Sequence, residues 1–283
     1  MKSITFSNAM MRIFFLGAAL ACTEATNRTV VITGATGRSG SDIYLLLKSA
    51  GVNVRGIVRD MAKAKTVLGC SNCDESEGIF IGDIMHQESL MPAMVGADTL
   101  VIATGLAKSE KPEDILFHGV QNQFAAFLSS PGPAPRDRHV LQISMMETTL
   151  LDTLFNKILA RFWGGWSVGF YSLQGESSLM DANVPFTILK ACGLDDAPAK
   201  QKQLDVGHYD KGWGQPAGKN TVSRHDVARV IAAAVQHPMV SSGLRFDLCS
   251  QPGTPQDDEL EVLKEAMFSW DPRKKVSSFG AVV

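Results

Sequence analysis

A short run of β-branched residues that ends in three evenly spaced glycines places the tightest constraint on how this chain folds. Thr29 to Thr33 predicts a buried strand, and Gly34, Gly37 and Gly40 follow it directly. Gly34 would permit a sharp turn, Gly37 would let another molecule approach the backbone, and Gly40 would let a following helix pack closely. The free amides and the dipole at the start of such a helix suit a phosphate group.

The residues after the glycines favour a dinucleotide site over an ordinary glycine-rich turn. An apolar helical pattern covers 41–49, Gly51 is placed to end that helix, and a second apolar run covers 52–58. Together they complete a strand, helix and strand of about 30 residues, the size of a nucleotide-binding unit. We therefore expect the amides near Gly34 to hold the diphosphate of a dinucleotide.

Strand-like and helix-like segments continue to alternate along the chain. Strands are predicted at 78–82, 99–104, 139–144, 185–190 and 244–248, and helices at 62–68, 90–95, 115–128, 175–181, 224–235 and 259–268. This alternation predicts an α/β fold, a Rossmann doubly wound parallel sheet with a small C-terminal extension on the substrate side. We expect one NAD(P)-binding domain over 28–270 and a loose tail over 271–283.

The composition is that of an ordinary globular protein. The 283 residues are 45% hydrophobic and 20% charged, and the formal net charge is -2. Such a balance gives no general attraction for nucleic acid or for acidic membranes. We expect a small-molecule substrate, or none, as the partner.

The first 21 residues resemble a secretory-type signal peptide. Lys2 and Arg12 precede an apolar run over 13–21, which ends in small residues suited to cleavage. The run is too short for a stable membrane span, which needs about 20 apolar residues. The segment predicts the secretory pathway or a plastid, and a cytoplasmic location if it is retained or if translation starts at Met10 or Met11.

The cysteines do not form a dense disulfide framework, because there are only five in the chain. Cys70 and Cys73 have the spacing of a redox pair or of half a zinc site, but no second pair or histidine cluster completes a metal site. We expect no metal. A plain loop is the favoured interpretation, and an oxidising compartment would favour a local disulfide there.

The end of the second strand predicts the nucleotide preference. Arg59 stands where an NAD enzyme presents a carboxylate to the ribose, and arginine suits the 2′-phosphate of NADP. Arg38 could share that phosphate. In the other interpretation Asp60 is the ribose ligand and the cofactor is NAD. Asp83, after the third strand, would lie near the adenine unless it only caps a helix.

The sequence resembles the atypical short-chain dehydrogenase/reductase family, in particular its NmrA-like NAD(P)-binding group, which includes small plant and plastid proteins. The matching segments are TGATGRSG (33–40), GIVRD (56–60), FIGDI (80–84), VQNQF (120–124), NVPFTILKACGL (183–194), TVSRHDVARVI (221–231) and RFDLCSQPGTP (245–255). By this resemblance, Thr104 and Gly105 border the cofactor, Ser144 lies beside the nicotinamide, and the segment from Ala191 to Leu194 walls its pocket. The full set of expected cofactor contacts is Gly34, Thr36, Gly37, Arg38, Ser39, Gly40, Arg59, Asp83, Ile84, Thr104, Gly105, Ala191, Gly193 and Leu194.

The chain departs from the family at the catalytic dyad. Active members use a tyrosine and a lysine four residues later, and the alignment places Phe170 and Gln174 at these positions. Tyr171 is adjacent, but Gly175 follows it where a lysine would be needed. The remaining catalytic candidates are Ser144, Tyr171 and Lys190; in the other interpretation Lys190 is a strand-end charge and Tyr171 a pocket wall.

Two functions fit these features. The first is an NADP-dependent oxidoreductase acting on a small carbonyl or quinone, with the aromatic residues near Trp166 and Phe170 stacking on a flat substrate. The same aromatic residues also fit plain packing. The second is a non-catalytic NADP-sensing protein with a regulatory or assembly role, favoured by the missing dyad. A nucleotide-sugar epimerase would need the same dyad.

Overall fold

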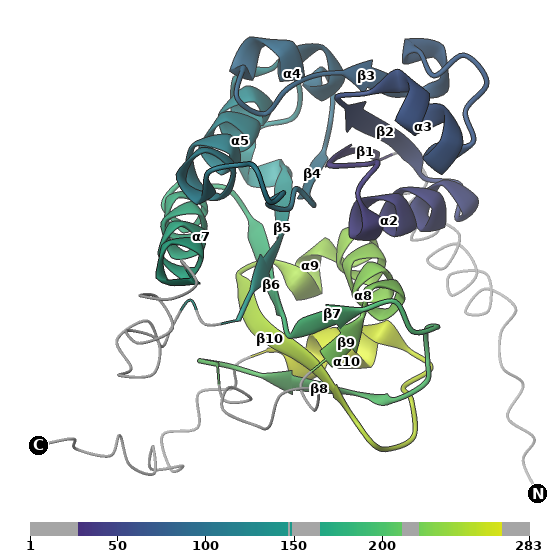
Figure 1. The fold of residues 1–283 in the computed structure, drawn as a ribbon, viewed down its shortest axis with the longest axis vertical. Coiled ribbons are helices and arrows are strands. Elements are labelled where there is room, and N and C mark those ends of the chain that lie inside the picture. Colours follow the sequence, from purple (N-terminus) through teal and green to yellow (C-terminus); the bar gives the residue numbers. More distant parts are fainter. Residues whose placement is uncertain (1–27, 147, 149–164, 211–220, 268–283) are drawn as a thin grey trace, which may run out of the picture.

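The computed structural model describes residues 28–146, 148, 165–210 and 221–267 (Figure 1). The expected signal peptide and C-terminal tail both lie outside these ranges. An eight-stranded sheet forms the centre of the described part of the chain. Its strands, in spatial order, are β3 (Ile79–Ile81), β2 (Asn53–Val58), β1 (Thr29–Thr33), β4 (Thr99–Ile102), β5 (His139–Met145), β6 (Phe186–Ala191), β10 (Leu244–Gln251) and β8 (Gln203–Gly207).

All neighbouring strands in this sheet are parallel except β10 and β8, which are antiparallel. The strand order reverses between β1 and β4, as in a doubly wound sheet. Two further strands, β7 (Gly193–Asp195) and β9 (Thr221–Ser223), form a separate parallel pair. The predicted α/β Rossmann fold is therefore confirmed.

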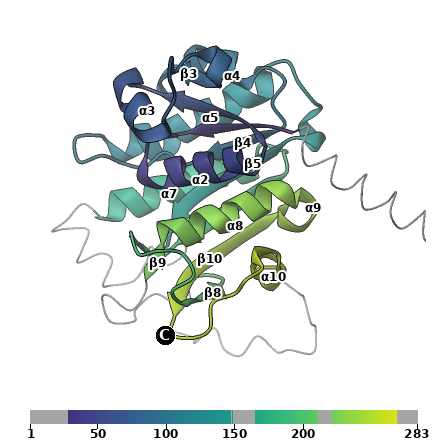
Figure 2. The ribbon, with the colours of Figure 1, turned by 90° about the vertical axis from the view of Figure 1, so that its right-hand side faces the viewer.

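Helices cover both faces of the sheet (Figures 1 and 2). One face carries α2 (Arg38–Ser49), α3 (Met61–Leu68), α8 (Arg224–Gln236) and α10 (Glu259–Glu265). The other carries α4 (Gln87–Met94), α5 (Gly119–Ser129) and α7 (Gly165–Met180). The remaining short elements are η1 (Glu75–Glu77), η2 (Glu113–His118), η3 (Pro135–Asp137) and α9 (Pro238–Ser241).

The strands alternate between two apolar cores because successive side chains point to opposite faces. On β1, Val30 and Ile32 belong to the core beneath α2 and α8, and Val31 belongs to the core beneath α4 and α5. All three side chains are fully buried. This burial on both faces explains why the strands appear as continuous β-branched runs in the sequence.

Helix α7 is longer than the sequence predicted. The apolar period predicts a helix over 175–181, whereas the structure extends it from Gly165 to Met180. Two glycines and a cluster of aromatic residues fill its first turns, and these residue types are weak helix formers. The helix packs closely on η2: an added Cβ at Gly175, the first residue of the predicted segment, would lie 2.2 Å from the carbonyl oxygen of Leu116. Among the described residues no helix is both long and apolar enough to cross a bilayer.

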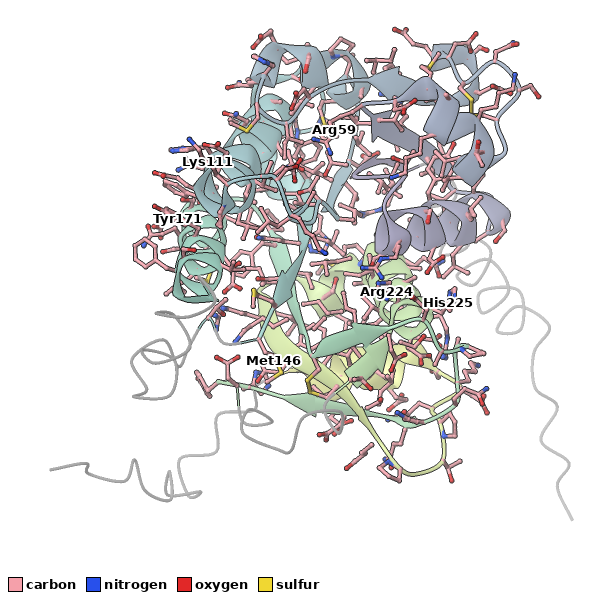
Figure 3. All side chains as sticks on the ribbon, viewed as in Figure 1. Arg59, Lys111, Met146, Tyr171, Arg224 and His225 are labelled. Carbon is pink, nitrogen blue, oxygen red and sulfur yellow. A yellow bond between two sulfur atoms is a disulfide. The ribbon has the colours of Figure 1, made fainter. Side chains whose placement is uncertain are left out.

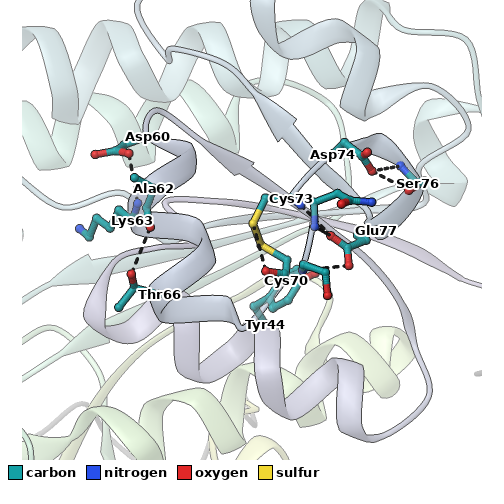
Figure 4. The surroundings of a disulfide bond; sticks show 12 residues. Tyr44, Asp60, Ala62, Lys63, Thr66, Cys70, Cys73, Asp74, Ser76 and Glu77 are labelled. Carbon is teal, nitrogen blue, oxygen red and sulfur yellow. Dashed lines mark hydrogen bonds between the residues drawn. A yellow bond between two sulfur atoms is a disulfide. The ribbon is translucent and has the colours of Figure 1, made fainter.

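Cys70 and Cys73 form a disulfide in the loop after α3 (Figure 4). The Glu77 carboxylate accepts backbone N–H groups from Ser71, Asn72 and Cys73, at 3.0, 2.8 and 2.6 Å. These bonds lower the pKa of Glu77. The favoured interpretation of Cys70 and Cys73 as part of a plain loop is therefore wrong, and the alternative of a local disulfide is the one found. A second disulfide joins Cys192, after β6, to Cys249 on β10.

His139 predicts a loss of stability at acidic pH. The side chain is 2% exposed and its Nε2 lies 2.8 Å from the Thr187 hydroxyl. Burial, followed by the positive charge of Arg28, lowers the pKa of His139 to about 4. The unfolded pKa is about 6.5, so the unfolded chain binds the extra proton first as pH falls. We expect the free energy of unfolding to fall by about 3 kcal/mol as pH falls from 6.5 to below 4.

Denaturant titrations across this pH range test the expectation. His139→Gln should remove most of this pH dependence, whereas the exposed control His86→Gln should retain it. An unchanged slope in His139→Gln would contradict the assignment.

Candidate functional site

The glycine turn lies at the carboxyl edge of the sheet, at the point where the strand order reverses. Gly34 has φ +69°, and an added Cβ would lie 2.7 Å from the carbonyl oxygen of Ala103. Side chains rarely adopt this φ, and the contact is too short for one. The turn therefore packs directly against the segment after β4, which carries Thr104 and Gly105.

Helix α2 begins with amides that face the same edge. Gly37 is its N-cap and supplies no side chain to bond the first-turn N–H groups of Arg38, Ser39 and Gly40. The Gly37 N–H itself donates to the Gly34 carbonyl at 2.8 Å, which closes the turn. A helix start without a side-chain cap offers free donors and a positive dipole end to an anion. This chemistry fits the diphosphate of a dinucleotide.

The two residues after β2 have separate contacts. The Asp60 carboxylate accepts the Lys63 N–H at 3.1 Å and so caps α3. Arg59 is 64% exposed, and its Nη1 donates to Glu110 Oε1 at 2.8 Å. This arrangement favours Arg59 over Asp60 as the group available to a nucleotide.

Other predicted cofactor residues lie along this edge with contacts of their own. Arg38 is exposed and lies 3.7 Å from Asp196, which follows β7. The Asp83 carboxylate accepts the Met85 N–H at 3.0 Å, and the N-cap position of α4 is His86, whose side chain makes no cap hydrogen bond. The residues expected to bind cofactor lie at or just after the carboxyl ends of β1, β2, β3, β4 and β6, because parallel strands end at one edge.

Ser144 lies on the face of the sheet covered by α7, in a buried polar cluster. Its hydroxyl donates to Glu176 Oε1 at 2.5 Å. The other oxygen of Glu176 accepts from Nη2 and Nε of Arg245, at 2.6 and 2.8 Å. Arg245 also donates to the Thr148 hydroxyl at 2.9 Å. The Glu176 side chain is fully buried, so these bonds fix the orientation of Ser144.

Lys190 on β6 is the residue paired with Ser144 on the neighbouring strand β5. The two side chains have different hydrogen-bond partners. The fully buried ammonium of Lys190 pairs with Asp210 and with Asp247, the latter at 3.2 Å. The Asp210 N–H donates to the second oxygen of Asp247 at 2.7 Å. A lysine held by two buried carboxylates is enclosed in the fold, and this arrangement favours a structural role.

Tyr171 lies at the outer edge of the molecule in Figure 3. It precedes Glu176 by five residues on α7, which places the two side chains roughly 140° apart around the helix. Desolvation, followed by the charge of Glu113 and a hydrogen bond to it, raises the pKa of Tyr171. A catalytic lysine would lower that pKa instead. The structure therefore places Ser144 and Lys190 next to each other and Tyr171 elsewhere. The neighbouring aromatic residues Phe162 and Trp163 lie outside the described residues.

Sequence reasoning missed the charged residues that surround Ser144 and Lys190. Arg245 and Asp247 alternate with buried apolar residues on β10, a period-two pattern that places both on the α7 face. That alternation could have been used to predict that Arg245 and Asp247 lie in the site. No pattern in the sequence predicted Glu176 or Asp210, since the residues they contact are distant in sequence.

Comparisons with known proteins agree with this geometry. The model of a family described as NAD(P)H-binding matches residues 34–238. An uncharacterised chloroplastic protein of Arabidopsis thaliana is 28% identical over 278 residues, covering 89% of this chain and 79% of that protein. Sanguinarine reductase of Eschscholzia californica is 27% identical over 258 residues, covering 79% of this chain and 89% of that protein.

A solved structure shows the same fold. A short-chain dehydrogenase/reductase of Veillonella parvula, in complex with NADP, superposes with a TM-score of 0.57 at 17% identity, covering 82% of this chain and 98% of that one. The family match includes the glycine turn, Ser144, Glu176 and Lys190, and it covers every strand of the central sheet except β1 and β10. The chain belongs to the NAD(P)H-binding family of Rossmann-fold proteins.

Proposed function

We propose that this protein is an NADP(H)-dependent oxidoreductase that reduces a small carbonyl or quinone. The observation that carries the proposal is the glycine turn with the uncapped start of α2 at the strand-order reversal. Support for a reductase comes from the similarity to sanguinarine reductase. Support for NADP comes from Arg59, whose guanidinium can bind a 2′-phosphate with several donors.

The buried cluster suggests how substrate would be oriented. A bound nicotinamide would supply hydride, which is the chemistry of the cofactor rather than of the protein. Ser144 is fixed at the end of β5 by Glu176, and Arg245 compensates the charge of that carboxylate. The hydroxyl can turn from Glu176 to a substrate oxygen without leaving the carboxylate unpaired. Ser144 would thus position and polarise the substrate carbonyl.

Arg59→Ala is expected to remove the preference for NADPH over NADH. Hydrogen bonds to charged groups contribute about 1.5–3 kcal/mol, so NADPH should bind about 10- to 100-fold more weakly while NADH changes little. Calorimetric titration with both nucleotides measures this. Arg136→Ala is a suitable control, because Arg136 is exposed in η3, away from the carboxyl edge. Equal weakening of both nucleotides would contradict the assignment of Arg59 to the 2′-phosphate.

An NADP-sensing protein without turnover is the second candidate. It is favoured by Phe170 and Gln174 at the dyad positions and by Tyr171, which faces Glu113 rather than Ser144. Deuterium at C4 of NADPH distinguishes the two functions. Transfer of the label to a carbonyl or quinone product supports the reductase, and a raised melting temperature with no transfer across the panel supports the sensor.

We also propose a plastid or secretory-pathway location. Similarity to chloroplastic proteins and the signal-type composition of residues 1–21 support it. A start at Met10 or Met11 would instead leave the protein cytoplasmic. Imaging of a C-terminal fluorescent fusion, with and without residues 1–21, separates these locations.

A further inference from the structure

An ion pair connects two loops at the proposed nucleotide edge. Arg59 follows β2, and Glu110 lies in the loop between β4 and η2. Arg59 Nη1 and Glu110 Oε1 are 2.8 Å apart. Figure 3 labels Arg59, at the end of β2, and Lys111, the residue after Glu110.

Glu110 is held in this place by its own loop. Its second carboxylate oxygen accepts the Ala107 N–H at 2.8 Å, and its N–H donates to the Ala107 carbonyl at 3.1 Å. The Glu110 side chain is 18% exposed, against 64% for Arg59. The glutamate is therefore the fixed partner, and the arginine is the one that can move.

The ion pair spans the end of β1. Strands β2 and β4 lie on either side of β1, so a contact between the loops that follow them crosses the glycine turn after β1. Gly34, in that turn, packs against Ala103 and Thr104 at the start of the Glu110 loop. The adenosine half of a dinucleotide held by the glycine turn would lie in this region.

We propose that Glu110 takes the place of the 2′-phosphate as the partner of Arg59 in the nucleotide-free protein and so limits the preference for NADP over NAD. This inference rests on the proposed NADP binding. A 2′-phosphate carries the charge needed to replace the carboxylate as partner of Arg59, whereas a 2′-hydroxyl does not. Glu110 competes with the phosphate for Arg59, so it lowers the affinity for NADP and leaves that for NAD nearly unchanged.

The Glu110 carboxylate is charged at neutral pH. The Ala107 N–H and then Arg59 hold the pKa of Glu110 below its ordinary value. The competition therefore operates throughout the physiological range.

Calorimetric titration with adenosine 2′,5′-bisphosphate and with ADP tests the inference on the full chain. Neither ligand contains nicotinamide, so the result does not depend on turnover. Glu110→Gln keeps an acceptor for the Ala107 N–H and removes the charge. We expect it to bind adenosine 2′,5′-bisphosphate about tenfold more tightly and ADP within about twofold of the original protein.

Glu113→Gln provides the matched control. This variant also removes one negative charge, three residues after Glu110. The Glu113 carboxylate faces Tyr171 and His118. Both affinities should stay within about twofold of the original. In Arg59→Ala/Glu110→Gln the tenfold gain should disappear.

Three outcomes would overturn the inference. Weaker binding of the 2′,5′-bisphosphate to Glu110→Gln would show that Glu110 positions Arg59 instead of competing for its ligand. An equal gain for both ligands would show a general charge effect. If neither ligand binds the original protein or the variant, the proposed cofactor fails as well; if ADP alone binds, only the 2′-phosphate assignment fails.

Discussion

Replacing Lys190 with methionine is expected to destabilise the fold by about 3–5 kcal/mol, the cost of breaking a buried ion pair by removing one partner. The Lys190 ammonium is fully buried between Asp210 and Asp247, both of which are themselves buried. Methionine fills a similar volume but leaves two carboxylates without their cation. Denaturant unfolding followed by circular dichroism measures the loss.

Two further variants make the Lys190 result specific. Lys200→Met removes an exposed lysine whose partner Asp257 is 96% exposed, and it should cost at most about 1 kcal/mol. Lys190→Arg keeps the charge and should recover part of the stability if Lys190→Met does not fold. A Lys190→Met protein of unchanged stability that lacks reductase activity would contradict the structural role and support the catalytic one.

Gly40→Ala is expected to weaken dinucleotide binding at least about 100-fold, equivalent to about 2.7 kcal/mol. An added Cβ would lie 2.1 Å from the carbonyl oxygen of Gly34, a backbone atom that no side-chain rotation can move away. The turn must shift, so the amides of α2 no longer meet the diphosphate. Overpacking of this kind also destabilises the fold by about 1–3 kcal/mol.

Calorimetry and thermal melting of the same samples separate the two effects of Gly40→Ala. Gly207→Ala on β8 is the control, because its added Cβ would make only an ordinary contact with Asp247, at 3.6 Å. It should bind nucleotide like the original protein. A folded Gly40→Ala variant with unchanged affinity would show that the turn does not hold the ligand.

Patterns local in sequence predicted most of the fold. Buried parallel strands such as β1 and β4 are continuous apolar runs, and the helices between them follow the expected period. The short strands β7 and β9 were not predicted, because three residues carry too little pattern. The first half of α7 was missed because its glycines and aromatic residues are weak helix formers and carry no clear apolar period.

The candidate site was predictable in part for the same reason. Gly34, Arg59 and Ser144 follow or end recognisable strands, so their place at the carboxyl edge could be inferred. The contacts that give them chemical meaning are long-range. Glu110 is 51 residues from Arg59, and Glu176 is 32 residues from Ser144. Only the folded chain brings these pairs together.

Binding of coenzyme to the purified protein tests the central claim most directly. Calorimetric titration with NADPH, NADP, NADH and NAD should show saturable heat, because the turn at Gly34 and the start of α2 offer free amides to the diphosphate of each coenzyme. The affinity should be highest for NADPH and NADP, which carry the 2′-phosphate. An absence of heat with all four coenzymes at millimolar concentration would contradict the account, even though the fold would remain a Rossmann sheet.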